Sequence, residues 1–232
     1  MPSIKKCALA LGGITGLLSA ALLSEAHVLK SAPQEQSIQT LVFLRHAEKP
    51  AEGLGQLNCQ GLNRAISLSH MLPERFGAAH YIFAANPTRK VEEGPKDESY
   101  HYIRPLMTIA PTAIRLGLPI NIEFEADEVD DFVDEILESK YRDKTIYTAW
   151  SRGYLPDVIN ELLSETKADS NLNVGHWSRD DFDSIFMVKL HWNGHGKPSV
   201  TLLDSDQKLD GGERDCPTPE VSQSGLSIDS EA

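Results

Sequence analysis

An arginine and a histidine stand side by side where an apolar segment of the chain ends. Leu41 to Leu44 predict a short buried strand, and Arg45 and His46 follow it before a charged loop that is closed by Pro50. In an open α/β sheet the ligand crevice lies beyond the carboxyl ends of the strands, so the pair would bring a fixed cation and a nucleophile into it. Taken alone, an Arg-His pair is more often a surface dipeptide that closes a strand.

Two further arginines occupy comparable positions. Arg104 opens a segment of helical spacing, and Arg152 directly follows a predicted strand. Guanidinium groups match phosphate oxygens, free amides at a helix N-terminus favour an anion, and a neutral imidazole can attack phosphorus. With Arg45 and His46, these residues predict a phosphate pocket. A phosphohistidine would form and be hydrolysed by water, and a carboxylic acid would protonate the leaving oxygen. Taken alone, Arg104 is an ordinary surface arginine.

The elements that must position these residues alternate between strand and helix. Apolar runs predict strands at 41–44, 81–84, 120–124, 144–150, 185–192 and 198–203, and helical spacing predicts helices at 58–72, 102–117, 129–137 and 156–163. Pro73 is expected to stop the first helix, Pro111 to kink or split the second, and the charged residues 88–100 to form a mobile loop. The predicted fold class is α/β: a three-layer sandwich, whose mostly parallel sheet has helices on both faces and an antiparallel edge hairpin.

Composition divides the chain into four parts. Residues 1–26 combine two lysines, an apolar run and small residues, which predicts a signal peptide, with a single membrane anchor as the alternative. Residues 27–38 predict a linker, residues 39–203 the folded domain, and residues 204–232 an acidic disordered tail. We therefore expect an exported protein, periplasmic or secreted, with no stable membrane insertion after cleavage.

The net charge argues against one class of partner. The formal net charge is -12 at pH 7, whereas binding to nucleic acid through the general field requires a basic surface. We expect no nucleic acid partner, and any anion site must be local.

Two cysteines, Cys59 and Cys216, remain after the N-terminal segment is removed. An oxidising compartment would allow a disulfide between them. The sequence alone does not place their Cα atoms within bonding range, so a disulfide and two free thiols are both open.

The motifs that contain these residues resemble the histidine phosphatase superfamily. This phosphoglycerate mutase-like group also contains the cofactor-dependent phosphoglycerate mutases. The resemblance covers about residues 39–192 and is carried by the strand with Arg45-His46-Ala47-Glu48, by Leu57 to Ala65, by Arg104-x-x-x-Thr108-x-x-Pro111-x-Ala113 and by Ala149 to Pro156. It implies that His46 is the nucleophile and that Arg45, Arg104 and Arg152 bind phosphate. One position departs from the family, because Arg152 stands where the second catalytic histidine is expected. His101 and His176 are nearby in sequence, but each is more readily an ordinary loop histidine.

The resemblance also suggests where the proton donor lies. The family often places it after the third strand, which favours Glu125 over its neighbours Glu123 and Asp127. Glu48, beside the nucleophile loop, is a further candidate. A solvated surface carboxylate remains the alternative at each position after the third strand.

The implied function is that of an exported phosphomonoesterase that acts through a phosphohistidine intermediate, without a metal or another cofactor. Its substrate would be a small-molecule phosphomonoester or a phosphorylated protein. Arg152 predicts slow turnover, because a permanent cation holds bound phosphate as strongly as the transition state. The alternative is a catalytically inactive protein that keeps the pocket and binds or senses a phosphate ligand. A mutase is less expected, because the chain is short and shows no clear sugar-phosphate site.

Overall fold

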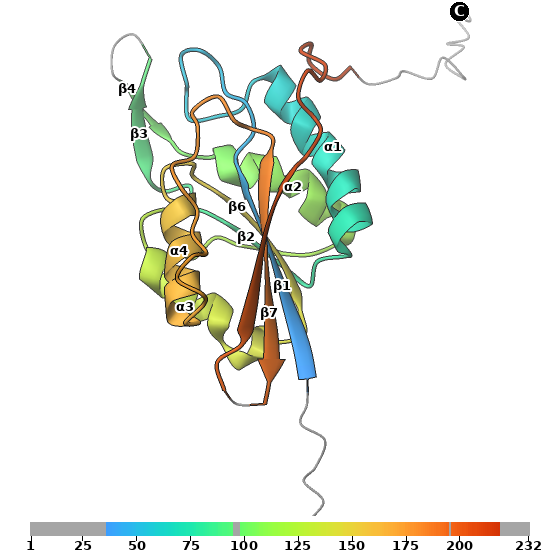
Figure 1. Ribbon diagram of the computed structural model, residues 1–232. Coiled ribbons are helices and arrows are strands. Elements are labelled where there is room, and N and C mark those ends of the chain that lie inside the picture. The colour runs from blue at the N-terminus through green and yellow to red at the C-terminus, as the bar shows by residue number, and fades with distance from the viewer. Residues whose placement is uncertain (1–35, 95–97, 195, 219–232) are drawn as a thin grey trace, which may run out of the picture. The chain divides into compact units, whose positions relative to one another are not determined.

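One six-stranded sheet forms the centre of the fold. Its strands are β1 (Gln36–Arg45), β2 (Tyr81–Ala84), β5 (Ile120–Asn121), β6 (Thr145–Trp150), β7 (Ser184–Asn193) and β8 (Ser199–Asp206). In the computed structural model, which describes residues 36–94, 98–194 and 196–218, they lie in the order β5-β2-β6-β1-β7-β8. The first four in this order run parallel, and β7 and β8 extend the sheet in antiparallel fashion (Figure 1).

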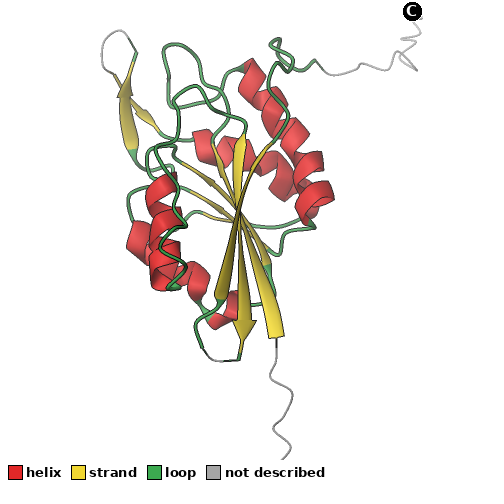
Figure 2. Ribbon diagram, viewed as in Figure 1, coloured by secondary structure: helices red, strands yellow, loops and turns green. Residues whose placement is uncertain are grey.

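Helices cover both faces of this sheet. They are α1 (Cys59–Phe76), α2 (Arg104–Leu116), α3 (Val129–Leu137) and α4 (Leu155–Glu165), and they lie on two sides of the strands (Figure 2). Successive strand residues point to opposite faces. Val42 and Leu44 of β1 therefore share a core with residues of α1 and α2, while Leu41 and Phe43 share one with residues of α3 and α4. Burial on both faces explains the unbroken apolar run and confirms the predicted three-layer α/β sandwich.

Two prolines that were expected to stop or divide a helix lie inside continuous helices instead. α1 contains Pro73 and ends at Phe76, followed by the cap residue Gly77 with a φ of 82°, and α2 contains Pro111 without being split. Buried neighbours such as Leu72 and Ile109 keep these helices packed on the sheet, and this packing offsets the backbone hydrogen bond that each proline removes. The third predicted strand is shorter than expected, because β5 contains two residues.

The segment predicted as a mobile loop instead contains a β-hairpin. Strands β3 (Lys90–Glu93) and β4 (Glu98–His101) pair in antiparallel fashion as a separate two-stranded sheet, with Lys90 opposite His101. The Tyr102 N–H donates to the Arg89 carbonyl at 2.9 Å and continues the pairing into the start of α2. The prediction was wrong because the strands are charged and lack the apolar alternation that identifies a strand.

The predicted limits of the linker and of the tail also change. β1 begins at Gln36, within the predicted linker, and β8 continues to Asp206, within the predicted tail. Residues 1–35, with the predicted signal peptide, and residues 219–232 lie outside the described residues. In the part of the chain that is described, no helix has the length and apolar composition needed to cross a membrane.

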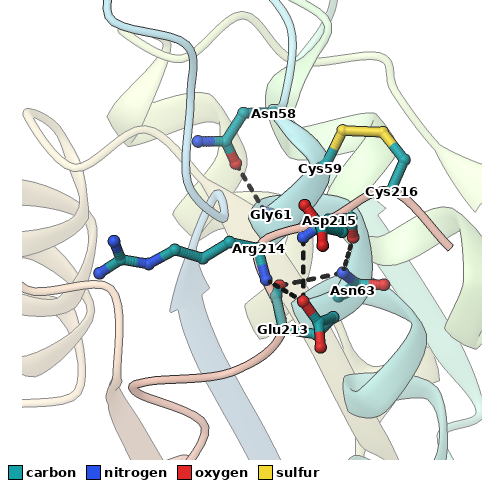
Figure 3. The surroundings of a disulfide bond; sticks show 8 residues. All are labelled: Asn58, Cys59, Gly61, Asn63, Glu213, Arg214, Asp215 and Cys216. Atoms are coloured by element: carbon teal, nitrogen blue, oxygen red, sulfur yellow. Dashed lines mark hydrogen bonds between the residues drawn. A yellow bond between two sulfur atoms is a disulfide. The ribbon is translucent and has the colours of Figure 1, made fainter.

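A disulfide and two hydrogen bonds from a side chain of α1 to backbone carbonyls hold the C-terminal segment against the first turns of this helix (Figure 3). Cys59 and Cys216 are bonded, with their Cα atoms 4.5 Å apart. The Asn63 side chain donates to the carbonyls of Glu213 and Asp215 at 3.0 and 2.7 Å. These contacts explain why the chain up to residue 218 is not the free tail that its composition suggests.

Buried Arg64 joins α1 to three other segments. Only 4% of Arg64 is exposed, and its guanidinium donates to Glu48 at 2.7 Å, to Asp183 at 2.9 Å, to Gln207 at 3.0 Å and to Asp210 at 2.6 Å. Burial alone would lower the pKa of Arg64, but the hydrogen bonds with these carboxylates outweigh it and raise the pKa. Arg64 thus links the loop after β1, the start of β7 and the segment after β8.

Replacing Arg64 with methionine is expected to lower the free energy of unfolding by about 3–5 kcal/mol, because the variant leaves the buried Glu48 and the half-buried Asp183 without their cation. Urea unfolding with the disulfide intact measures this change. Arg115→Met, at an exposed position of α2, is the matched control and should change stability by about 0.5 kcal/mol or less. Equal effects of the two substitutions would contradict the role assigned to Arg64.

Candidate active site

The pairing of β1 with β6 brings three of the predicted residues to one end of the sheet. Arg45 is opposite Trp150, and the His46 N–H donates to the Trp150 carbonyl at 3.1 Å. Arg152 comes two residues after Trp150, so it lies at the same end of the sheet as Arg45. A cavity of about 460 Å³ opens here, and its lining includes Arg45, His46, Arg152 and Arg104. The structure thus brings together the four residues that the sequence suggested for a phosphate pocket.

The cavity is strongly cationic, although the whole chain carries a formal charge of -12. Six of its lining residues are cations, and two are carboxylates: Arg45, Lys49, Arg89, Arg104, Arg152 and Arg179 against Glu92 and Glu93. Among the residues that the structure describes, no group of three His, Cys, Asp or Glu side chains could hold a metal ion. The cavity is therefore suited to an anion.

His46 is held as a neutral imidazole with one nitrogen free to react. It is 4% exposed, and its Nδ1 lies 2.7 Å from the Ala47 carbonyl oxygen. Because a carbonyl only accepts, Nδ1 carries the hydrogen and Nε2 keeps its lone pair. Burial, followed by the charge of Arg45, lowers the pKa of His46 well below 6.5. This is the protonation state that a nucleophile requires.

Thr108 connects the start of α2 to the loop that carries His46. Its hydroxyl accepts from the Ala47 N–H at 2.9 Å and donates to the Arg104 carbonyl at 2.8 Å. The contact sets the first turn of α2 beside His46. The Tyr102 ring, just before this helix, meets His46 edge-on with ring centroids 5.8 Å apart, and burial raises the pKa of its hydroxyl. Tyr102 is therefore a second neutral hydrogen-bonding group in the cavity.

Arg45 both supplies charge and holds a neighbouring loop. Its Nη1 donates to the carbonyls of Arg179 at 2.8 Å and Asp181 at 2.5 Å, and its guanidinium carbon lies 3.7 Å from the centre of the Phe182 ring. Burial, then the nearby charge of Arg152, lowers the pKa of Arg45 to about 10, so it remains a cation at neutral pH.

Two donors in this region lack a partner. The Nε–H groups of Arg45 and Arg104 are buried and make no hydrogen bond within the described part of the protein. An unsatisfied buried donor costs about 1–3 kcal/mol, and an anion in the cavity is an acceptor that would remove this cost.

Arg152 stands at the position where the sequence resemblance implies a second catalytic histidine. It is half-buried, and its Nη1 donates to the Trp177 carbonyl at 3.0 Å. His101 and His176 are both exposed and do not line the cavity. Neither is therefore in place to act as the second histidine.

The carboxylate in the cavity differs from the one expected. Glu125, the predicted proton donor, lies in the loop between β5 and α3 and does not line the cavity, and neither do Glu123 and Asp127. That loop crosses the end of the sheet, where the Phe124 carbonyl accepts from the Asn86 N–H at 2.7 Å. Glu48 is engaged by Arg64 instead of facing His46.

Of the two carboxylates that line the cavity, Glu93 of the β3–β4 hairpin is the one that contacts its cations. It is ion-paired with Arg104, receives Lys49 Nζ at 3.2 Å and accepts from the Gly55 N–H at 3.1 Å. Burial alone would raise the pKa of Glu93, but the bonds from Gly55 and Arg104 outweigh it and lower the pKa. Without a ligand, this carboxylate acts as the counter-ion of Arg104.

Sequence reasoning missed several residues of the cavity. Arg89 lies close to the carboxyl end of β2, so the same positional rule that selected Arg45 applies to it. Glu93 and Arg179 come from segments without a recognisable period, and only the tertiary structure brings them to the site.

Comparison with known proteins yields structural neighbours only. The sequence matches no protein-family model and no curated protein. One neighbour is a protein assigned as the phosphohistidine phosphatase SixA from Nakamurella multipartitia, with 15% identity, coverage of 72% of this chain and 95% of that chain, and a TM-score of 0.45. A second is a mycobacterial glucosyl-3-phosphoglycerate phosphatase, with 13% identity, coverage of 71% of this chain and 97% of that chain, and a TM-score of 0.44. A third is a phosphoserine phosphatase mutant from Entamoeba histolytica in complex with phosphoserine, with 13% identity, coverage of 74% of this chain and 98% of that chain, and a TM-score of 0.42. Similarity at this level does not identify a function.

The buried neutral state of His46 predicts a pH dependence of stability. The unfolded chain binds a proton on this residue as pH falls through about 6.5, whereas the folded protein does not, so folding stability is lost below that pH. Between pH 7.5 and 5.5, wild type should lose more unfolding free energy than His46→Asn, with a difference in slope of up to about 1.4 kcal/mol per pH unit. Urea unfolding at the two pH values measures it.

The control for this experiment is His176→Asn, at an exposed position. It should follow wild type. If His46→Asn loses as much stability as wild type on acidification, His46 is not held neutral in the folded protein.

Proposed function

We propose that the protein is a phosphomonoesterase that transfers the phosphoryl group to His46 and then to water. The observation that carries this proposal is the shared cavity, in which a buried, neutral histidine with a free Nε2 is accompanied by Arg45, Arg104 and Arg152. The unsatisfied Nε–H groups of Arg45 and Arg104 support an anion as the ligand. The sequence resemblance to histidine phosphatases points to the same residues.

The reaction follows from the chemistry of these groups. The guanidinium groups hold the phosphate oxygens and offset the charge that develops on them. The lone pair of His46 Nε2 forms a bond to phosphorus while the bond to the ester oxygen breaks, and this oxygen leaves as an alcohol after taking a proton. Water then attacks the phosphohistidine, which restores His46 and releases inorganic phosphate.

Glu93 is the carboxyl group best placed to supply the proton to the leaving oxygen. In the free protein its low pKa makes it ionised, with Arg104 as its partner. A phosphate dianion bound to Arg104 competes for this partner and brings negative charge near the carboxylate. Both effects favour the protonated carboxyl. Glu93 would thus become an acid when substrate binds and act as a base toward water in the second step.

Arg152 makes turnover slow in this proposal. A permanent cation binds the phosphate product as well as the transition state, and binding of that kind does not raise the rate. We therefore expect inhibition by inorganic phosphate.

Trapping of the intermediate tests the function directly. Wild type incubated with a ³²P-labelled aryl phosphate and quenched in alkali should carry acid-labile phosphate on His46, and His46→Ala should lower hydrolysis by about 10³-fold or more because the nucleophile is missing. His176→Ala is the matched control and should keep wild-type activity. Arg152→His should turn over faster with weaker inhibition by phosphate.

One outcome would favour the alternative function. If wild type hydrolyses no phosphomonoester and forms no phosphohistidine, yet binds inorganic phosphate, the protein is a binding or sensing protein that keeps the pocket without turnover.

The role of Glu93 is tested with leaving groups of different basicity. Glu93→Gln should lower hydrolysis of an alkyl phosphate by about 10²-fold or more, because an alkoxide needs the proton, and should change hydrolysis of p-nitrophenyl phosphate little. The substitution also removes a competitor for Arg104, so inorganic phosphate should bind more tightly. Steady-state kinetics and phosphate inhibition constants measure both effects.

Glu92 supplies the matched control, because it is the preceding residue of β3, lines the same cavity and is exposed. Glu92→Gln makes the same change of charge. If it lowers alkyl phosphate hydrolysis as much as Glu93→Gln, the effect is one of net charge and the assignment of Glu93 fails.

A further inference from the structure

The positive charge of the cavity exceeds what one phosphomonoester can neutralise. The cavity is lined by six cations and two carboxylates, whereas a phosphoryl group carries about two negative charges at neutral pH. Arg45, Arg104 and Arg152 already suffice as its ligands in the proposed function. Of the three remaining cations, Lys49 is paired with Glu93, so Arg89 and Arg179 are left without a role in the reaction.

Arg179 is the less satisfied of these two residues. It belongs to the loop whose carbonyls are held by Arg45, and it is exposed at the rim of the cavity. Its guanidinium makes no hydrogen bond or ion pair with any of the described residues. Like charges nearby disfavour this placement, and a bound anion would offset that effect.

Arg89 reaches the same cavity from the end of β2. Its Nη2 lies 3.3 Å from the Tyr154 hydroxyl, and its Nη1 is 3.6 Å from Asp127, with 32% of the side chain exposed. The ion pair is long and partly solvated, so it neutralises Arg89 only weakly. Arg89 thus remains available to a ligand at the rim.

The cavity also has room for more than the reacting phosphate. A phosphate group takes roughly 60–90 Å³, counted as two to three waters of about 30 Å³ each, out of about 460 Å³. Val91 is the single aliphatic side chain among the described residues that line the space. The remainder of the ligand is therefore expected to be compact and polar, not a large apolar group.

We propose that Arg89 and Arg179 form a second anion-binding subsite, so that the substrate is a small molecule with a phosphomonoester at one end and a second phosphate or a carboxylate at the other. The inference rests on the proposed function for the place of the reacting phosphate. The second anion binds at the rim, where it neutralises the surplus cations and orients the ester toward His46.

Two compounds of equal carbon length test this subsite: propyl phosphate and propane-1,3-diyl bisphosphate. Wild type should show a kcat/KM at least about tenfold higher for the bisphosphate, as expected for one added charge-assisted contact. The double variant Arg89→Gln/Arg179→Gln should lose this preference, so that its kcat/KM falls at least about tenfold more for the bisphosphate than for propyl phosphate. A 3-carboxypropyl phosphate arm distinguishes a carboxylate from a phosphate at the rim.

The control is Arg115→Gln/Arg214→Gln, which makes the same change of net charge at two exposed positions outside the cavity. It should keep the preference for the bisphosphate. Equal kcat/KM values of wild type for the two compounds, or equal losses in both double variants, would overturn the subsite.

A binding experiment separates this inference from the proposed function. Calorimetry on His46→Ala measures the affinity for the same two compounds without turnover. Tighter binding of the bisphosphate that depends on Arg89 and Arg179 supports the subsite, even if wild type proves to have no phosphatase activity. Equal affinities contradict it, whatever the activity.

Discussion

The arrangement of the site depends on the ion pairs and hydrogen bonds of the buried Arg64 guanidinium. This guanidinium binds Glu48, which follows His46 by two residues, together with Asp183, Gln207 and Asp210. All of these acceptors lie outside α1, the helix that carries Arg64. A buried charge that loses its partner is strongly destabilising, so these contacts hold the segments together. The loop that carries His46 is therefore held in place by an ion-pair network that lies outside the cavity. The disulfide between Cys59 and Cys216 holds the last of these segments close to α1.

The balance of positive and negative charge differs between the Arg64 network and the cavity. Around Arg64 the cation is fully matched by carboxylates, and at the cavity the cations outnumber the carboxylates. Burial, and then the nearby cations, lower the pKa of His46, so the charges that favour an anion also help to keep the imidazole neutral. In the proposed function, the same cations thus favour both anion binding and the neutral state of the nucleophile, within a protein whose overall charge is negative.

The parts of the site that the sequence predicts are those set by local rules. Arg45, His46 and Arg152 end parallel neighbouring strands, and Arg104 begins a helix, so strand periodicity and the rule for carboxyl ends were enough to gather them. Glu93 could not be found in this way, because its strand is charged on both faces and its contact with Arg104 depends on how the hairpin folds back. The sequence did not predict the Arg64 network or the ordered segment after β8 for a similar reason. The contacts of Arg64 with Asp183, Gln207 and Asp210 join residues more than 100 positions apart, and the acidic composition of the segment alone suggests disorder.

In the proposed function, the effect of Arg152 has to be considered together with that of Glu93. Three permanent cations would bind the phosphate product tightly and slow its release. In the proposed function, Glu93 pairs with Arg104 and so competes with that product and weakens its binding. It would weaken binding of the transition state less, because the carboxyl donates a proton there. Glu93 would thereby offset part of the cost of Arg152, and the hairpin that brings Glu93 to the cavity would be a condition for turnover.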